Sequence, residues 1–126
     1  MKGVAVKSAQ PVLTVKSVSQ AVDWYCQVLG FSSEYVNPTS GTKNSSNYAI
    51  LRNGSVIIHL GKEKDMGVIA GHGGCNFMTN QFECYYRSAN KFNLEFHVEL
   101  GQIPNGARTF GIKDPDGNLL TFIESC

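Results

Sequence analysis

Three residues of one predicted strand have side chains that could bind a metal ion. Glu95, His97 and Glu99 alternate along an extended segment, so they are expected to share one strand face. Successive same-face positions lie roughly 7 Å apart because of the strand rise, which makes a single ion hard for all three to reach. We therefore interpret this trio as a solvated strand face.

A cysteine and a histidine could form a nucleophile and its base. Cys75 and His59 are the residue types that such a pair needs, and a working pair also needs a third group that orients the base. Neither that group nor an oxyanion-binding loop is recognisable in the sequence. The sequence does not favour a cysteine-dependent enzyme.

The cysteines are also considered for disulfides and metal binding. All four are widely spaced, without a CxxC pair: Cys26, Cys75, Cys84 and Cys126. Reduced thiols in a cytoplasmic protein are the simplest interpretation. Their even number leaves disulfide bonds open.

These residues must be positioned by secondary structure, and the first half of the chain has clear signals for it. Residues 10–16 are predicted to form a strand. Ser17 and Gln20 form a capping-box pattern, and Gly30 provides a stop, so a helix is expected between Ser17 and Gly30. Further strands are expected at 31–36, 47–52 and 55–61, with a polar loop over 37–46. The last two strands flank Asn53-Gly54, a strong hairpin signal.

The same order of elements is predicted again in the second half. It comprises a strand at 74–80, a helix at 81–92, and strands at 94–100, 107–113 and 118–125. Asp114-Pro115-Asp116-Gly117 has the residues of a tight turn between the last two strands. Residues 62–73 connect the halves. We expect one domain, 1–126, with one module at about 10–61 and a second at about 74–124.

Composition restricts the class of protein. The 126 residues are 42% apolar and 17% charged, which predicts a soluble globular chain with a core of its own. The net charge is +1 and the basic residues are scattered, so neither nucleic acid nor a membrane surface is an expected partner. Lys7 interrupts the N-terminal apolar residues, and no segment approaches the roughly 20 apolar residues of a membrane span, so a cytoplasmic location is expected.

Three segments resemble the vicinal-oxygen-chelate superfamily of glyoxalase I, extradiol dioxygenases, and fosfomycin- and bleomycin-resistance proteins. They are Val12–Val15 with the helix through Ala21–Tyr25 to Val28–Phe31, then Val56–Leu60, and Gly106–Glu124. The last of these resembles the closing hairpin of the bleomycin-resistance-like branch. The resemblance implies an α+β fold, in which two βαβββ modules form a cupped mixed sheet with helices outside. It also implies a small-molecule cavity and a homodimer.

In the catalytic members of that superfamily, four inward side chains bind a divalent metal. The resemblance assigns these positions to Gln10, His59, Cys75 and Thr121. Gln10 and His59 are acceptable ligands, but Cys75 stands where histidine is usual and Thr121 replaces the carboxylate that commonly acts as general base. A set with at most one anion is poor for Zn, Ni, Fe or Mn. We therefore expect no metal and no other cofactor.

The resulting interpretation is a metal-independent protein, without catalytic residues, that sequesters or senses a partly aromatic small molecule. Phe77 and Phe110 are expected to line the cavity, with Phe122 on the helix side. Arg108 would bind a ligand carboxylate or stack on an aromatic ring, and a surface or interface ion pair is equally expected. The expected ligand-binding residues are Gln10, Val12, Tyr48, His59, Cys75, Phe77, Arg108, Phe110 and Thr121.

Two other interpretations stay open. One is a divalent-metal-dependent lyase, isomerase or dioxygenase with an unusual set of metal ligands. The other is a structural or interaction module whose cavity is filled by its own side chains.

Overall fold

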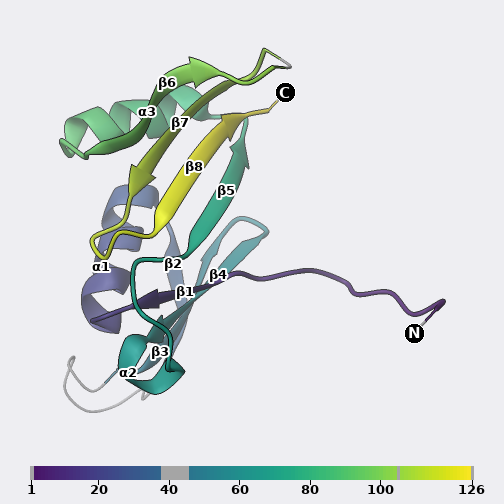
Figure 1. The fold of residues 1–126 in the computed structure, drawn as a ribbon, viewed down its shortest axis with the longest axis vertical. Helices are drawn as coiled ribbons and strands as arrows, with labels where there is room; N and C mark the ends of the chain where they lie inside the picture. The colour runs from purple at the N-terminus through teal and green to yellow at the C-terminus, as the bar shows by residue number, and fades with distance from the viewer. Residues whose placement is uncertain (1, 38–45, 105, 126) are drawn as a thin grey trace.

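The structure, a computed structural model, describes residues 2–37, 46–104 and 106–125. Its order of elements confirms the doubled plan of strand, helix and three strands (Figure 1). The first half contains β1 (Val12–Val15), α1 (Val18–Leu29), β2 (Ser32–Asn37), β3 (Tyr48–Asn53) and β4 (Val56–Lys62). The second half contains β5 (Gly74–Thr79), α3 (Phe82–Lys91), β6 (Phe96–Gln102), β7 (Arg108–Lys113) and β8 (Leu119–Glu124). Residues 38–45 of the predicted loop lie outside the described residues.

The strands form two four-stranded mixed sheets. Sheet A has the order β1-β4-β3-β2 and sheet B the order β5-β8-β7-β6, and in each the first strand is parallel to its neighbour. The edges β1 and β5 face each other, since the N–H of Gly71, just before β5, donates to the carbonyl of Thr14 in β1. The α+β class is confirmed, with two separately hydrogen-bonded sheets making up the expected cup.

The helices cover the outer faces of the two sheets. Helix α1 packs on β3 and β4, α3 packs on β8, and the helices contact each other. A short helix that the sequence analysis does not predict, α2 (Glu63–Met66), follows β4. Within the described ranges, no helix combines the length and the apolar character that crossing a bilayer requires.

Local signals account for the bounds of α1 and of the first hairpin. The hydroxyl of Ser17 accepts a hydrogen bond from the N–H of Gln20, as an N-cap does. Gly30 ends the helix with φ of 75°, a left-handed conformation that glycine adopts without strain. The turn after β3 also uses glycine, because Gly54 has φ of 61°. These predicted features are confirmed.

Strand β6 differs from its predicted alternation. Phe96 pairs with Ile112, whereas Val98 pairs with Gly111, and the register shifts between the two pairs. Ile112 is buried under α3, so Phe96 faces the helix, and Val98 contacts Gly111 on the opposite sheet face. A bulge adds a residue to the strand, so the regular alternation expected through Glu95, His97 and Glu99 is interrupted there.

The core lies between the sheets and their helices. In module one it is aliphatic around Tyr25, and in module two it is largely aromatic. Phe110 is fully buried, stacks on Phe122 at 5.1 Å and meets Phe82 of α3 edge-on at 5.2 Å. Aromatic pairs in these geometries gain energy beyond the burial of their area. The core residues of both modules include Leu13, Val15, Leu51, Ile58, Leu60, Ile112 and Leu120.

A buried carboxylate connects the halves. Asp114, in the β7–β8 turn, is 4% exposed and accepts a 2.6 Å hydrogen bond from the hydroxyl of Tyr25 in α1. The amide of Asn118 donates both to Asp114 and to the carbonyl of Thr14. Its oxygen accepts the N–H of Gly73. A buried carboxylate needs such donors, so these bonds hold the closing turn against β1 and α1.

The first prediction concerns this connection between the modules. Tyr25→Phe removes one donor from the buried carboxylate and should lower the free energy of unfolding by about 2 kcal/mol. Urea denaturation followed by circular dichroism measures the change. Tyr35→Phe, on the exposed strand β2, is the matched control and should leave stability unchanged. Equal stability of Tyr25→Phe and wild type would contradict the role given to this bond.

Tyr25 should also make the stability of the protein depend on pH in the alkaline range. Burial first, and then the charge of Asp114, raise the pKa of Tyr25 well above its ordinary value. The unfolded chain releases this proton at about pH 10, whereas the folded chain retains it. Stability should therefore fall as the pH rises above that point, and Tyr25→Phe should lack this part of the fall.

Candidate functional site

The inner face of sheet A carries four of the predicted site residues. Leu13 and Leu60 are buried toward α1, so by alternation Val12 and His59, which pair across β1 and β4, point to the inner face. Tyr48 enters the same face from β3, and Gln10 comes from the segment before β1. The structure thus brings Gln10, Val12, Tyr48 and His59 together.

Three of these side chains form a hydrogen-bonded chain. The Nε2 of His59 lies 2.7 Å from the Oε1 of Gln10, and its Nδ1 lies 2.6 Å from the hydroxyl of Tyr48. An amide oxygen can only accept, so Nε2–H donates to Gln10, and in the tautomer with its single proton on Nε2, Nδ1 accepts from the hydroxyl of Tyr48. Burial raises the pKa of Tyr48, which keeps its hydroxyl protonated as the donor. Both nitrogens of His59 are therefore engaged.

The inner face of sheet B corrects one predicted residue. In the parallel pairing of β5 with β8, Cys75 lies beside the fully buried Leu120, and Asn76 lies beside Thr121. Cys75 therefore packs against the core, and Asn76 takes the inward position next to Thr121. Cys75 is therefore on the core face of sheet B and not on the inner face, but it does line the hollow where the two sheets meet.

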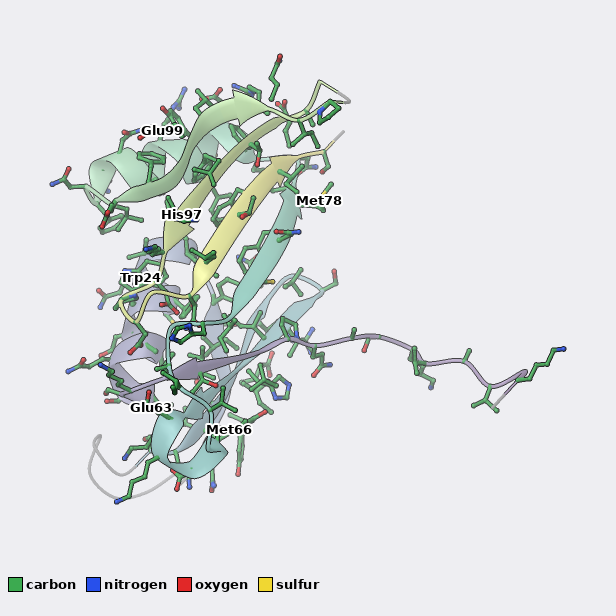
Figure 2. All side chains as sticks on the ribbon, in the orientation of Figure 1. Trp24, Glu63, Met66, Met78, His97 and Glu99 are labelled. Carbon is green, nitrogen blue, oxygen red and sulfur yellow. The ribbon has the colours of Figure 1, made fainter. Side chains whose placement is uncertain are left out.

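A hollow of about 390 Å³ lies where the two sheets meet. Gln10 and Pro11 line it from the segment before β1, Ile57 from β4, and Cys75, Asn76 and Met78 from β5. Met78 is labelled on β5 in Figure 2 and is 63% exposed. At the other end of the sheet A face, the side chain of Met66 from α2 lies against Gly61 and covers it. We call the hollow between β1, β4 and β5 the seam cleft.

The predicted aromatic lining is only partly present. Phe110 is fully buried under α3 and cannot line the cleft, so that prediction is wrong. Phe122 is on the helix side, as expected. Phe77 also points to the core, but its edge borders the seam cleft and a neighbouring hollow of about 320 Å³ that includes Phe31 and Tyr85.

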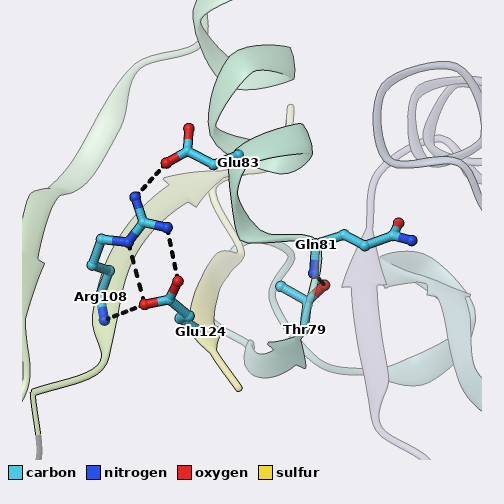
Figure 3. Close-up of polar contacts among 5 residues, drawn as sticks. All are labelled: Thr79, Gln81, Glu83, Arg108 and Glu124. Carbon is cyan, nitrogen blue, oxygen red and sulfur yellow. Dashed lines mark hydrogen bonds and ion pairs between the residues drawn. The ribbon is translucent and has the colours of Figure 1, made fainter. Parts of the chain in front are cut away.

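Arg108 lies on the helix side of sheet B, away from the seam cleft. Its Nε and Nη2 donate to Glu124 at 3.2 and 2.7 Å, and its Nη1 donates to Glu83 of α3 (Figure 3). The guanidinium also lies 4.8 Å from the ring centroid of Phe82. Of the uses expected for Arg108, the structure shows the ion pair and the contact with an aromatic ring, here a ring of the protein's own core. These contacts raise the pKa of Arg108 and lower that of Glu124.

The residues at the inner positions do not match the ligand set of a catalytic divalent ion. Gln10, His59, Asn76 and Thr121 are neutral, and His59 already uses both nitrogens. Burial raises the pKa of the Cys75 thiol, so its thiolate, the one anion that the predicted ligand set could supply, is not readily formed. In the described part of the chain, no group of three or more histidine, cysteine, aspartate or glutamate side chains is placed to hold a metal.

Several lining residues were missed by the sequence analysis. Pro11, Ile57, Asn76 and Met78 line the seam cleft. A signal for two of them is present in β5, where the apolar Cys75 and Phe77 alternate with Asn76 and Met78. Packing Phe77 into the core would have placed Asn76 and Met78 inward. Pro11 and Ile57 depend on where the modules meet, which alternation within one strand does not define.

Comparisons with solved structures return the same fold. TioX from Micromonospora sp. ML1 matches with a TM-score of 0.81 at 19% identity, over 95% of this chain and 100% of that one. A bleomycin-binding protein in complex with bleomycin matches with a TM-score of 0.74 at 18% identity, over 96% of this chain and 100% of that one. Lactoylglutathione lyase from Agrobacterium tumefaciens matches with a TM-score of 0.76 at 16% identity, over 96% of each chain.

Comparison with curated proteins finds no match. The family model described as the glyoxalase/bleomycin resistance protein/dioxygenase superfamily matches residues 7–122, which is most of the chain. The chain therefore belongs to the glyoxalase/bleomycin resistance protein/dioxygenase superfamily.

Proposed function

We propose that this protein binds a small, partly aromatic molecule in the seam cleft, without a metal ion, and thereby sequesters or senses it. The observation that carries the proposal is the chain Gln10–His59–Tyr48, in which the histidine is held by two neutral partners. Of these residues Gln10 lines the cleft, so the chain fixes in place a polar group that a ligand would meet there, and it needs no metal ion to do so. Binding of this kind requires affinity alone.

The lining of the cleft supports a ligand of mixed character. Ile57 and Met78 offer apolar surface, and Gln10 and Asn76 offer amide donors and acceptors. A volume of about 390 Å³ falls within the range of roughly 300–1,000 Å³ that is usual for small-molecule sites. The bleomycin-binding neighbour adds support for a small-molecule ligand, at the level of shared fold.

A cytoplasmic homodimer is part of the proposal. On the inner face of sheet B, Met78 is 63% and Val98 42% exposed, which is unusual for large apolar side chains on one sheet face. A second copy packed against Met78 and Val98 would bury them and narrow the cleft. Sedimentation velocity should show a dimer, and Val98→Lys should shift the population toward monomer. A wild-type chain that stays monomeric at all concentrations would contradict the dimer.

The main test is ligand-dependent stabilisation. A thermal-shift screen of aromatic small molecules, with bleomycin included, should give hits that raise the unfolding midpoint, since a ligand at 100 times its Kd adds about 2.7 kcal/mol. Asn76→Trp, at an exposed position in the cleft, should abolish the shift by filling the site. Asn90→Trp, on the exposed surface of α3, is the control. Hits that respond equally to both variants would refute the cleft as the site.

Metal independence has its own test. The untagged protein should carry divalent metal far below one ion per chain, and the ligand-induced shift should survive treatment with a chelator. A stoichiometric metal that is lost in His59→Ala, together with activity on glutathione hemithioacetal or catechol, would replace this proposal with a metal-dependent lyase or dioxygenase.

A further prediction separates the structural use of Arg108 from ligand binding. Arg108→Gln should lower the unfolding midpoint at pH 7 and leave ligand affinity unchanged. Arg108 lowers the pKa of Glu124. The stabilisation from this ion pair is therefore fully present above about pH 4.3, the ordinary pKa of glutamate, and is lost as the pH falls through the lowered pKa of Glu124. The midpoints of variant and wild type should therefore converge in acid. Arg87→Gln, exposed on α3, is the control, and a loss of ligand affinity specific to Arg108→Gln would refute this assignment.

A further inference from the structure

A separate hollow of about 260 Å³ lies on the inner side of sheet B, at the end nearest the segment that connects the modules. The glycine-containing segment 71–73 and Gly117 of the β7–β8 turn form part of its wall. Lys113 of β7, His97 of β6 and Leu119 of β8 also line it. Figure 2 labels His97 where β6 runs beside β7, above the β7–β8 turn. We call this hollow the basic hollow.

Three side chains that can carry positive charge line the basic hollow. His72, His97 and Lys113 come from three different segments of the chain. Within the described residues, none of these side chains has a hydrogen-bond or ion-pair partner. Cationic groups that converge on one concavity without counter-ions are the electrostatic arrangement that attracts an anion.

The acidic residues of the adjoining turn have hydrogen-bond partners outside the hollow. The carboxylate of Asp114 is buried and accepts from Tyr25 and Asn118, and that of Asp116 accepts the N–H of Lys16. Neither aspartate lines the hollow. The basic groups thus face an open space without a carboxylate in its lining.

The glycines of the hollow allow close packing but do not themselves bind an anion. A Cβ on Gly71 would lie 2.0 Å from the carbonyl oxygen of Asp116, so only glycine fits there. The N–H groups of Gly71, Gly73 and Gly117 donate to Thr14, Asn118 and Asp114, in that order. These three N–H groups are therefore not available to an anion, and the side chains of His72, His97 and Lys113 are the charged groups that would hold it.

The position of the basic hollow relates it to the seam cleft. Along the β5–β8 pair, Leu119 lies beside Gly74, and Thr121 lies beside Asn76, which lines the cleft. Two residues along a strand span roughly 7 Å, so the two sites occupy neighbouring parts of one inner sheet face. A single small molecule can therefore reach from one to the other.

We propose that the basic hollow binds an anionic group, a carboxylate or a phosphate, and that the ligand of the seam cleft is an aromatic molecule that carries this group. The second half of the proposal rests on the proposed function, whereas the anion site stands on its own residues. Because side chains and not backbone N–H groups make the contacts, the site should depend strongly on Lys113.

The experiment is a titration of the ¹⁵N-labelled protein with inorganic phosphate, followed by ¹H–¹⁵N NMR in a phosphate-free buffer of low ionic strength. Amide signals of residues 71–74 and 113 should shift, and Lys113→Gln should weaken binding by about fivefold or more, as the loss of a charge-assisted contact predicts. Lys91→Gln, on α3 outside the hollow, is the matched control. Unfolding midpoints establish that both variants fold.

Further probes separate the two anions and the two halves of the proposal. Comparing the affinities for acetate and for phosphate identifies the preferred anionic group. Phenyl phosphate and benzoate should in addition shift the amide signals of Asn76 and Met78. Phosphate shifts that persist unchanged in Lys113→Gln, or the absence of shifts at the hollow, would overturn the anion site. Aromatic hits in the cleft without phosphate binding would overturn it while the proposed function stands. Phosphate binding with no response of the cleft to any aromatic probe would overturn the shared ligand alone.

Discussion

The carboxylate of Asp114 is the constraint on which the arrangement of the two modules depends. It is buried at the end of module two, where it accepts hydrogen bonds from Tyr25 of α1 and from Asn118. Asn118 donates in turn to the carbonyl of Thr14 in β1, so the closing turn is fixed to module one by directional bonds. Apolar packing between α1 and α3 alone would permit sliding, whereas a buried charge with defined donors does not. The edges β1 and β5, and hence the seam cleft, are placed by this network.

Within that arrangement, the chemistry of the cleft is decided by neutral groups. Gln10 and Tyr48 hold His59 from both sides, and this satisfies the half-buried imidazole without a metal ion. Across the cleft, sheet B presents Asn76, with Thr121 beside it on the same face, and both can form hydrogen bonds but supply no negative charge. Desolvating a divalent ion among such groups is unfavourable. The same surface suits an uncharged part of an organic molecule, for which burial and a few hydrogen bonds are sufficient.

Much of the fold could be predicted because its signals are local. The N-cap Ser17, the stop at Gly30 and the Asn53-Gly54 turn each act within a few residues, and the structure shows all three. The site was harder to predict because it depends on which face of a strand a residue occupies. The bulge in β6, which separates Phe96 from Val98, and the burial of Phe110 under α3 arise from tertiary packing. Alternation within one strand does not reveal either of them.

The face of one strand also links the core to the chemistry of the site. In β5, the large Phe77 must enter the core beside Phe122, and strand alternation then carries Cys75 to the same side. Burial there raises the pKa of the thiol, so the residue that could have brought an anion to the cleft stays neutral. Asn76 takes the inward position in its place. The packing of module two therefore leaves the inner face uncharged at the cleft, and positive groups gather only farther along it, beside Lys113.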